Sequence, residues 1–163
     1  MTENQTVRRR RVVVPGEDEQ PSSELARELA QQSDALSAAY DKAAAAIAGL
    51  RLGVSGAVAI AQQQDPDDTD ATIWSLRFAK DGDEWALTIT KWNTDEPEWN
   101  EHAMEPAHAP RWIRERGAKV LPELVKKLHH NAREELARVR AATAEIESFA
   151  ANIESLSKAI GGS

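Results

Sequence analysis

The chain has 163 residues with a formal net charge of -7, and 41% of its residues are hydrophobic. This length fits one domain, and the absence of cysteine excludes disulfides, thiolate metal ligands and a cysteine nucleophile. No apolar run reaches the roughly 18 residues of a membrane span, and the N-terminus lacks the apolar stretch of a secretory signal, so we expect a cytoplasmic protein without a membrane partner.

Residues 1–21 are polar, charged and aperiodic, and we expect them to form a disordered tail. The basic run Arg8–Arg11 in this tail is offset by the acidic residues that follow it, so direct nucleic-acid binding is not favoured. Ser22 or Ser23 is the expected N-cap of a long helix, because a serine hydroxyl accepts a hydrogen bond from a free backbone N–H there. Apolar residues keep helical spacing to about residue 51.

Residues 57–63 form a short apolar run that predicts a strand, although its periodicity also allows a short helix. A hairpin follows, in which Asp81-Gly82 is expected to form a two-residue type I′ turn. This turn pairs Phe78 with Trp85 and places six large apolar residues on one face of the hairpin. These residues are Trp74, Leu76, Phe78, Trp85, Leu87 and Ile89. Together with residues 57–63, the hairpin predicts a three-stranded antiparallel sheet.

Residues 93–108 are too many for a simple connection, and loops of this length are often functional or disordered. The first part of this loop belongs to a longer acidic region, residues 65–105. This region contains twelve acidic and three basic residues, which gives it a net charge of -9. Tryptophans in or beside the loop either anchor it or contact a partner, since tryptophan is enriched at interface hot spots. The expected partner-binding residues are Trp92, Trp99, Trp112, Asp95, Glu96, Glu98 and Glu101.

The sequence gives no support for catalysis or for a cofactor. The histidines and acids between Glu98 and His108 match no recognised metal-site spacing. The side chains of His129 and His130 diverge by about 100° on a helix. No nucleophile, phosphate-loop or zinc-protease motif occurs. We therefore expect neither an enzyme nor a metal or cofactor site.

The C-terminal third predicts a short helix opened by Pro110, a break at Gly117 and Pro122, and then a long helix to Ile160. The last three residues, 161–163, are expected to be flexible. The long helix carries a heptad repeat. Its a positions are Val125, Ala132, Val139, Ile146, Ile153 and Ile160, and its d positions are Leu121, Leu128, Glu135, Ala142, Phe149 and Leu156.

The long helix would be about 15 Å longer than the N-terminal helix at 1.5 Å per residue. Its e and g positions are mostly small or uncharged, which favours a compact bundle in which the two long helices pack antiparallel. An extended coiled-coil dimer is the alternative.

The fold expectation is therefore one α+β domain over residues 22–160. The expected function is that of a non-catalytic adaptor, regulator or assembly subunit. It would bind another protein, or a second copy, through the long helix and residues 93–112. The alternative is an acidic inhibitor, of the kind found in phages and mobile elements, that occupies the nucleic-acid-binding site of another protein.

Overall fold

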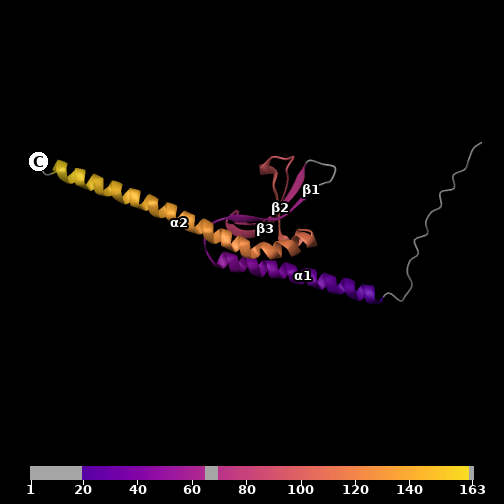
Figure 1. Ribbon diagram of the computed structural model, residues 1–163. Coiled ribbons are helices and arrows are strands. Elements are labelled where there is room, and N and C mark those ends of the chain that lie inside the picture. Colours follow the sequence, from indigo (N-terminus) through magenta and orange to yellow (C-terminus); the bar gives the residue numbers. More distant parts are fainter. Residues whose placement is uncertain (1–19, 65–69, 162–163) are drawn as a thin grey trace, which may run out of the picture.

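The computed structural model describes residues 20–64 and 70–161 and shows an α+β fold. Two long helices lie on one side of an antiparallel sheet with the strand order β1-β2-β3-β4 (Figure 1). The helices are α1 (Gln20–Gly49) and α2 (Arg111–Gly161), and the strands are β1 (Gly56–Gln64), β2 (Ala71–Asp81), β3 (Glu84–Asn93) and β4 (His102–Met104). Two short 3-10 helices, η1 (Glu98–Asn100) and η2 (Pro106–His108), flank β4.

Helix α1 begins at Gln20, two residues before the first of the expected N-cap serines. Pro21 is accommodated in its first turn, where a backbone N–H would have no helical acceptor. The rest of the predicted tail, including Arg8–Arg11, lies outside the described residues, as do residues 162 and 163 of the predicted flexible end. The residues of α1 that pack on the core keep helical spacing. They are Leu36, Tyr40, Ala43, Ala44 and Ile47.

The sheet has four strands, so the prediction of three was wrong. The strand expected over residues 57–63 is confirmed as β1, with a bulge between Ala59 and Ala61. The fourth strand, β4, lies within the segment that we expected to be a loop, and it pairs antiparallel with β3. Three residues are too few to show an alternating pattern, so no sequence signal predicted this strand. Its pairing with β3 is what defines it as a strand.

The hairpin forms, but its register differs by two residues from the prediction. Asp81 pairs with Glu84, so the turn residues are Gly82 and Asp83. Only Gly82 has a positive φ, of 60°, which is the pattern of a type II′ turn with glycine at its first central position. A shift of two residues keeps every side chain on its predicted face. Phe78 now faces Leu87, and Trp85 lies diagonally across and stacks on the Phe78 ring at 5.5 Å.

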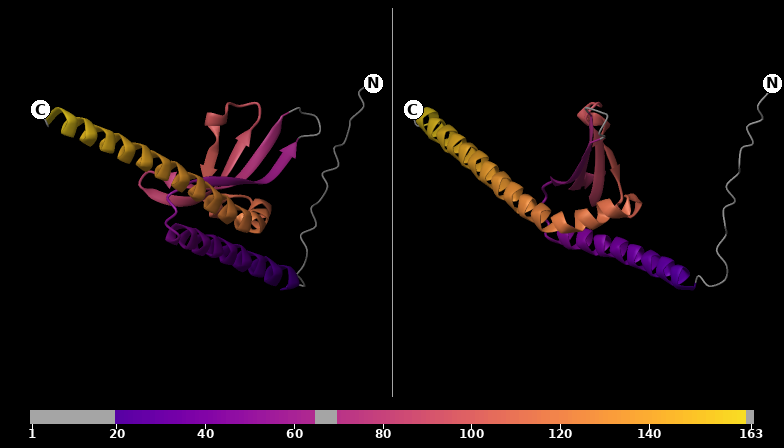
Figure 2. Two further views of the ribbon diagram at one scale, coloured as in Figure 1. Left: turned by 60° about the vertical axis from the view of Figure 1, so that its left-hand side comes forward. Right: turned by 45° about the vertical axis from the view of Figure 1, so that its right-hand side comes forward.

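Helix α2 is one continuous helix of 51 residues, about 77 Å long, and the predicted break at Gly117 and Pro122 is wrong. Both residues lie inside the helix. Pro122 removes one backbone donor, and Figure 2 shows that the axis of α2 bends within its N-terminal part. Core contacts on both sides of the proline, through Leu121 and Leu124, hold the helix together across it.

The two helices run in the same direction (Figures 1 and 2), so the predicted antiparallel pair is also wrong. Later residues of α2 contact later residues of α1. Arg114 of α2 bonds Ser33 and Ser37, and Gly117 lies against Tyr40. The reason is topological. The strands and η2 carry the chain back past the C-terminal end of α1, so that α2 starts beside residues 29–37 of α1 and continues in the same direction.

The core lies between the sheet and the first half of α2, with α1 along the side. Its fully buried residues include Leu76, Ile89, Ile113, Leu124 and Leu128. From residue 133 onward the sheet no longer covers α2, and every residue of α2 from 133 to 161 is exposed. The heptad helix is therefore not the spine of a compact bundle, because α1 runs alongside its beginning and cannot reach its second half.

Candidate functional site

The segment after β3 is held in place by its own hydrogen bonds. Trp92 Nε1 donates to the Glu96 carbonyl oxygen at 3.0 Å, and Asn100 Nδ2 donates to Glu96 Oε2 at 2.8 Å. The Thr94 hydroxyl accepts from the Ala71 backbone N–H at 2.8 Å. Trp92 and Glu96 thus anchor this segment, which is one of the two roles that the sequence allowed for the tryptophans.

The predicted tryptophans do not form one surface. Trp92 pairs with Ile73 across β2 and β3, on the face opposite to Trp74. Trp112, at the start of α2, packs edge-on against Trp74 with ring centroids 6.3 Å apart, and the Arg116 guanidinium lies 5.4 Å from its ring. Trp99 belongs to η1, and its side chain lies outside the described part of the chain. Trp92 and Trp112 therefore lie on opposite faces of the sheet.

Two of the predicted acids do come together with Trp92. Glu98 and Glu101 line a hollow of about 330 Å³ with Trp92, Ile73 and Ser75 on the outer face of the sheet. Glu101 also pairs with Arg77 at 3.1 Å, which reduces the charge it presents to a partner. Of the other predicted acids, Asp95 is exposed, whereas Glu96 is bonded within the segment.

The contact between α1 and α2 has a polar centre that the sequence did not reveal. The buried Arg114 guanidinium donates to the hydroxyls of Ser37 at 2.8 Å and Ser33 at 2.7 Å. The Tyr40 hydroxyl donates to the Arg114 carbonyl oxygen at 2.6 Å. Burial raises the pKa of Tyr40 to about 12, and the positive charge of Arg114 lowers it only in part. This cluster holds α1 on α2, and the Tyr40 hydroxyl occupies the space beside Gly117.

A larger hollow, of about 700 Å³, lies where α2 leaves the sheet. It is bordered by Arg77 and Lys80 of β2 and by Glu134, Glu135 and Arg138 of α2. The Asn131 amide, also at this border, donates to the Ser55 carbonyl oxygen at 2.8 Å. This hollow joins residues far apart in sequence, so no local pattern could have predicted it.

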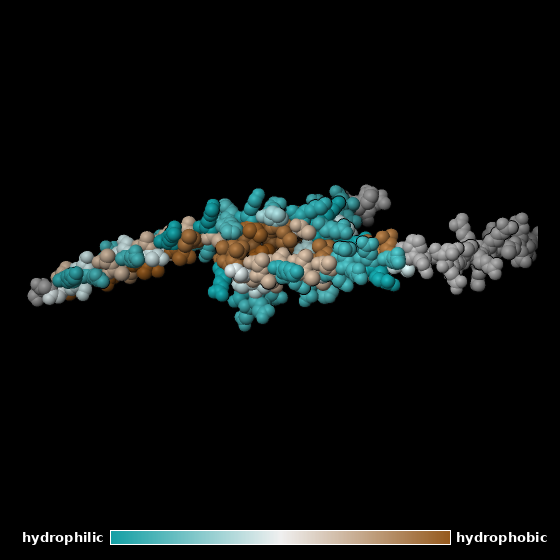
Figure 3. Space-filling view, turned by 90° about the horizontal axis from the view of Figure 1, so that it is seen from below, coloured by the Kyte–Doolittle hydropathy of each residue, from teal (hydrophilic) through white to brown (hydrophobic). Residues whose placement is uncertain are grey.

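Among the described residues, the second half of α2 carries seven of the eleven exposed large apolar side chains. We define the apolar stripe as the exposed large side chains between residues 133 and 161. They are Leu136, Val139, Ile146, Phe149, Ile153, Leu156 and Ile160, and they are between 49% and 78% exposed. Apolar residues follow the projecting helix in Figure 3. Soluble proteins rarely leave so long a contiguous apolar surface open unless it is an interface.

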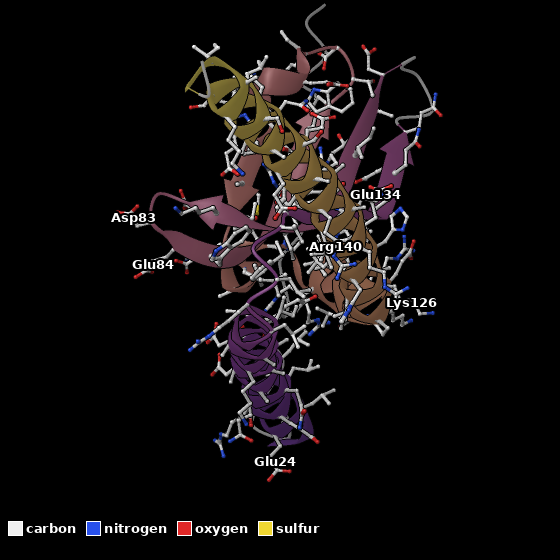
Figure 4. The ribbon with its side chains drawn as sticks, turned by 90° about the vertical axis from the view of Figure 1, so that its left-hand side faces the viewer. Glu24, Asp83, Glu84, Lys126, Glu134 and Arg140 are labelled. Atoms are coloured by element: carbon white, nitrogen blue, oxygen red, sulfur yellow. The ribbon has the colours of Figure 1, made fainter. Side chains whose placement is uncertain are left out.

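Charged residues fill the b positions of α2 from residue 126 to residue 154, beside the apolar stripe. Figure 4 looks along α2 from its C-terminal end, and Lys126, Glu134 and Arg140 project there away from the β2–β3 turn, where Asp83 and Glu84 lie. These three residues occupy b and c positions of the heptad. Polar b and c positions beside apolar a and d positions are the pattern of a helix that packs along one seam.

Within residues 20–64 and 70–161, no group of three or more histidines and acids is placed to hold a metal ion. In the same residues, no helix combines the length and the apolar character needed to cross a membrane. No protein-family model, curated protein or solved structure matches this chain. The case for function therefore rests on the surfaces described above.

Proposed function

We propose that this chain is a non-catalytic protein-binding module and that the apolar stripe of α2 is its binding surface. The observation that carries the proposal is the exposure of seven large apolar side chains along one face of a single helix. Burying a large aliphatic or aromatic side chain contributes about 1.5–3 kcal/mol, so an uncovered stripe of this length is a strong source of binding energy. An adaptor, a regulator and an assembly subunit would all use such a surface.

We infer that fewer residues of the segment 93–112 contribute to binding than the sequence predicted. Trp92, Glu96 and Glu101 already have partners within the chain. Glu98 and the exposed part of Trp112 are accessible to a binding partner, and their contribution to binding stays a prediction. We place them at the rim of the interaction and the apolar stripe at its centre, because buried aromatic and aliphatic anchors dominate binding energy.

The experiment compares the full chain with one stripe variant and one matched control. Ile146→Glu places a charge on the apolar stripe, whereas Ala144→Glu places the same charge at an f position of the same turn. Affinity capture from the native host, with quantitative mass spectrometry, should find a bound protein, a second copy included, that Ile146→Glu loses and Ala144→Glu retains. If no bound protein distinguishes the two variants, the apolar stripe is not a binding surface.

The acidic-inhibitor hypothesis stays a prediction of lower rank. Three of the acids on which it depends, Asp65, Asp67 and Asp68, lie outside the described residues. Its test is salt-sensitive binding to a basic nucleic-acid-binding protein that weakens when these acids, Asp95 and Glu96 are neutralised together.

A further inference from the structure

The exposed part of α2, residues 133–161, is a straight continuation of the helix beyond the sheet (Figure 2). Its 29 residues span about 44 Å. Its two most exposed large side chains, Ile160 at 78% and Ile146 at 68%, stand on the same helix face as the fully buried Leu124 and Leu128. The apolar stripe is therefore the core-facing side of α2, extended past the point where its own sheet can cover it.

We propose that a second copy of this chain covers the apolar stripe, and that the two projecting helices pack as an antiparallel two-stranded coiled coil. This inference rests on the proposed function and names the partner. A closed two-fold dimer buries the same surface on both copies, and the heptad repeat supplies matching apolar positions on each.

The position of the sheet determines the direction of the second helix. Strands β1 and β2 pack on the a/d face of α2 up to Leu128, and the apolar stripe continues this same face. In a parallel pair, the sheets of both copies, which cover this face up to Leu128, would have to fit between the two helices where the coiled coil begins. A coiled coil holds its helices only about 8–10 Å apart, so there is no room for them. In an antiparallel pair the sheets lie at opposite ends of the dimer. Only the antiparallel arrangement lets residues 133–161 pair along their whole length.

The heptad then selects one register. In an antiparallel pair each a residue faces a d residue of the other helix, and the two helices must end at each other's sheets. The register that places the two-fold axis between Glu147 and Ser148 meets both conditions, because Glu147 is the midpoint of residues 133–161. It joins six apolar layers across the two copies. The layers pair Val139 with Leu156, Ala142 with Ile153, and Ile146 with Phe149, each pair occurring twice.

Neighbouring registers are worse for two separate reasons. A shift of one heptad toward the sheets sets Glu145 against Glu145 of the second copy and pushes each C-terminal end about 10 Å into the sheet. The opposite shift leaves Val139 uncovered. In the proposed register no like charges meet along the seam: Glu145 flanks Asn152 of the second copy, and Arg138 flanks Ala159. At each end Ile160 meets Glu135, whose carboxylate its own chain's Arg138 already binds.

The first test is the molar mass of the full chain by sedimentation equilibrium across a wide concentration range. We expect a dimer with a dissociation constant in the micromolar range or tighter. Ile146→Glu should weaken the dimer at least about 100-fold, because each dimer would bury two unpaired carboxylates. Ala144→Glu should leave the dissociation constant within about threefold, since an f position faces solvent. Unchanged tryptophan fluorescence verifies that both variants keep the folded domain.

The second test is the direction of the helices, and the absence of native cysteine makes it direct. A mixture of Val139→Cys and Leu156→Cys chains should form the mixed disulfide under mild oxidation. In the antiparallel dimer, the two copies of Val139→Cys lie about 25 Å apart, far beyond the roughly 7 Å limit between Cα atoms for a disulfide. In a parallel dimer the copies of Val139→Cys would instead face each other and join.

The outcomes separate this inference from the proposed function. A dimer that Ile146→Glu disrupts, with the mixed disulfide, supports both. A Val139→Cys dimer joined to itself overturns the antiparallel arrangement but retains the protein-binding function. If the chain is a strict monomer but binds a different protein that Ile146→Glu releases, the second copy is not the partner. The protein-binding function is then still supported. A strict monomer without any stripe-dependent partner overturns both.

Discussion

Replacing Gly117 with alanine should destabilise the domain, although the same change stabilises most helices. A Cβ atom at this position would lie 2.5 Å from the Tyr40 hydroxyl oxygen and 3.4 Å from Ile60 Cδ1. The first distance is far inside van der Waals contact. Tyr40 must therefore move, and its 2.6 Å hydrogen bond to the Arg114 carbonyl oxygen is lost.

The magnitude follows from three opposing contributions. Forcing an extra carbon into a packed core costs about 1–3 kcal/mol, and the lost hydrogen bond costs about 0.5–1.5 kcal/mol. Alanine has a better helix propensity than glycine by about 1 kcal/mol. We expect Gly117→Ala to lower the free energy of unfolding by about 1–3 kcal/mol.

Tyr40→Phe provides the control, because it removes the hydroxyl that the new Cβ would strike. The ring carbon that carries this hydroxyl lies 3.7 Å from the Cβ position of residue 117, which is an ordinary contact. In the Tyr40→Phe background, Gly117→Ala should then stabilise the domain by up to about 1 kcal/mol, from helix propensity alone. The four proteins of this cycle are compared by urea unfolding with tryptophan fluorescence, at one chain concentration.

The cycle refutes the reasoning if Gly117→Ala stabilises the wild-type chain, or if it costs the same free energy in both backgrounds. In either case the glycine would not be required by the approach of Tyr40. A change of sign between the two backgrounds is the expected result.

Three further predictions concern single groups. The pKa of Tyr40 is about 12 in the fold, against 10 for an unperturbed tyrosine. Between pH 10 and 12 the unfolded chain therefore holds fewer protons than the folded one. The contribution of Tyr40 to the free energy of unfolding is complete below pH 10 and is lost as the pH rises toward 12. Tyrosinate absorbance should give the elevated pKa directly because the chain has one tyrosine, and Tyr40→Phe should reduce the fall in stability. Trp92→Phe removes the 3.0 Å bond to the Glu96 carbonyl oxygen and should speed amide hydrogen exchange in residues 94–101, while exchange in α1 is unchanged. Arg77→Ala breaks a partly exposed pair with Glu101 and should change the free energy of unfolding by less than about 1 kcal/mol in urea titration, a larger loss showing that the pair anchors β4.

Local sequence patterns predicted the elements whose signal repeats over many residues. Helix α1, strand β1 and the two faces of the hairpin are as expected because periodicity identifies which side of each element is apolar. The short strand β4 has no such repeat and was missed. The hairpin register was off by two because Asp81-Gly82 and Gly82-Asp83 both supply a glycine to the turn, and both keep the same faces.

The candidate site divides in the same way. The heptad correctly identified the apolar face of α2 beyond residue 132, but the sequence could not say whether its own chain covers that face. Trp92 and Trp112 are close in sequence, yet they lie on opposite sides of the sheet. The hollow at Arg77, Lys80 and Arg138 has no sequence signal, because it forms only where α2 leaves the sheet.

The sequence by itself determined most of the helical and extended segments and which of their faces are apolar, because these properties depend mainly on neighbours within a few residues. Only the tertiary structure decided what lies against those faces. Gly117 and Pro122 have the composition of a helix break, yet the helix continues, since glycine admits Tyr40 and core contacts flank the proline. The strands return the chain to the middle of α1, so that α2 runs in the same direction as α1 and extends beyond the sheet. That long-range geometry leaves the apolar stripe uncovered.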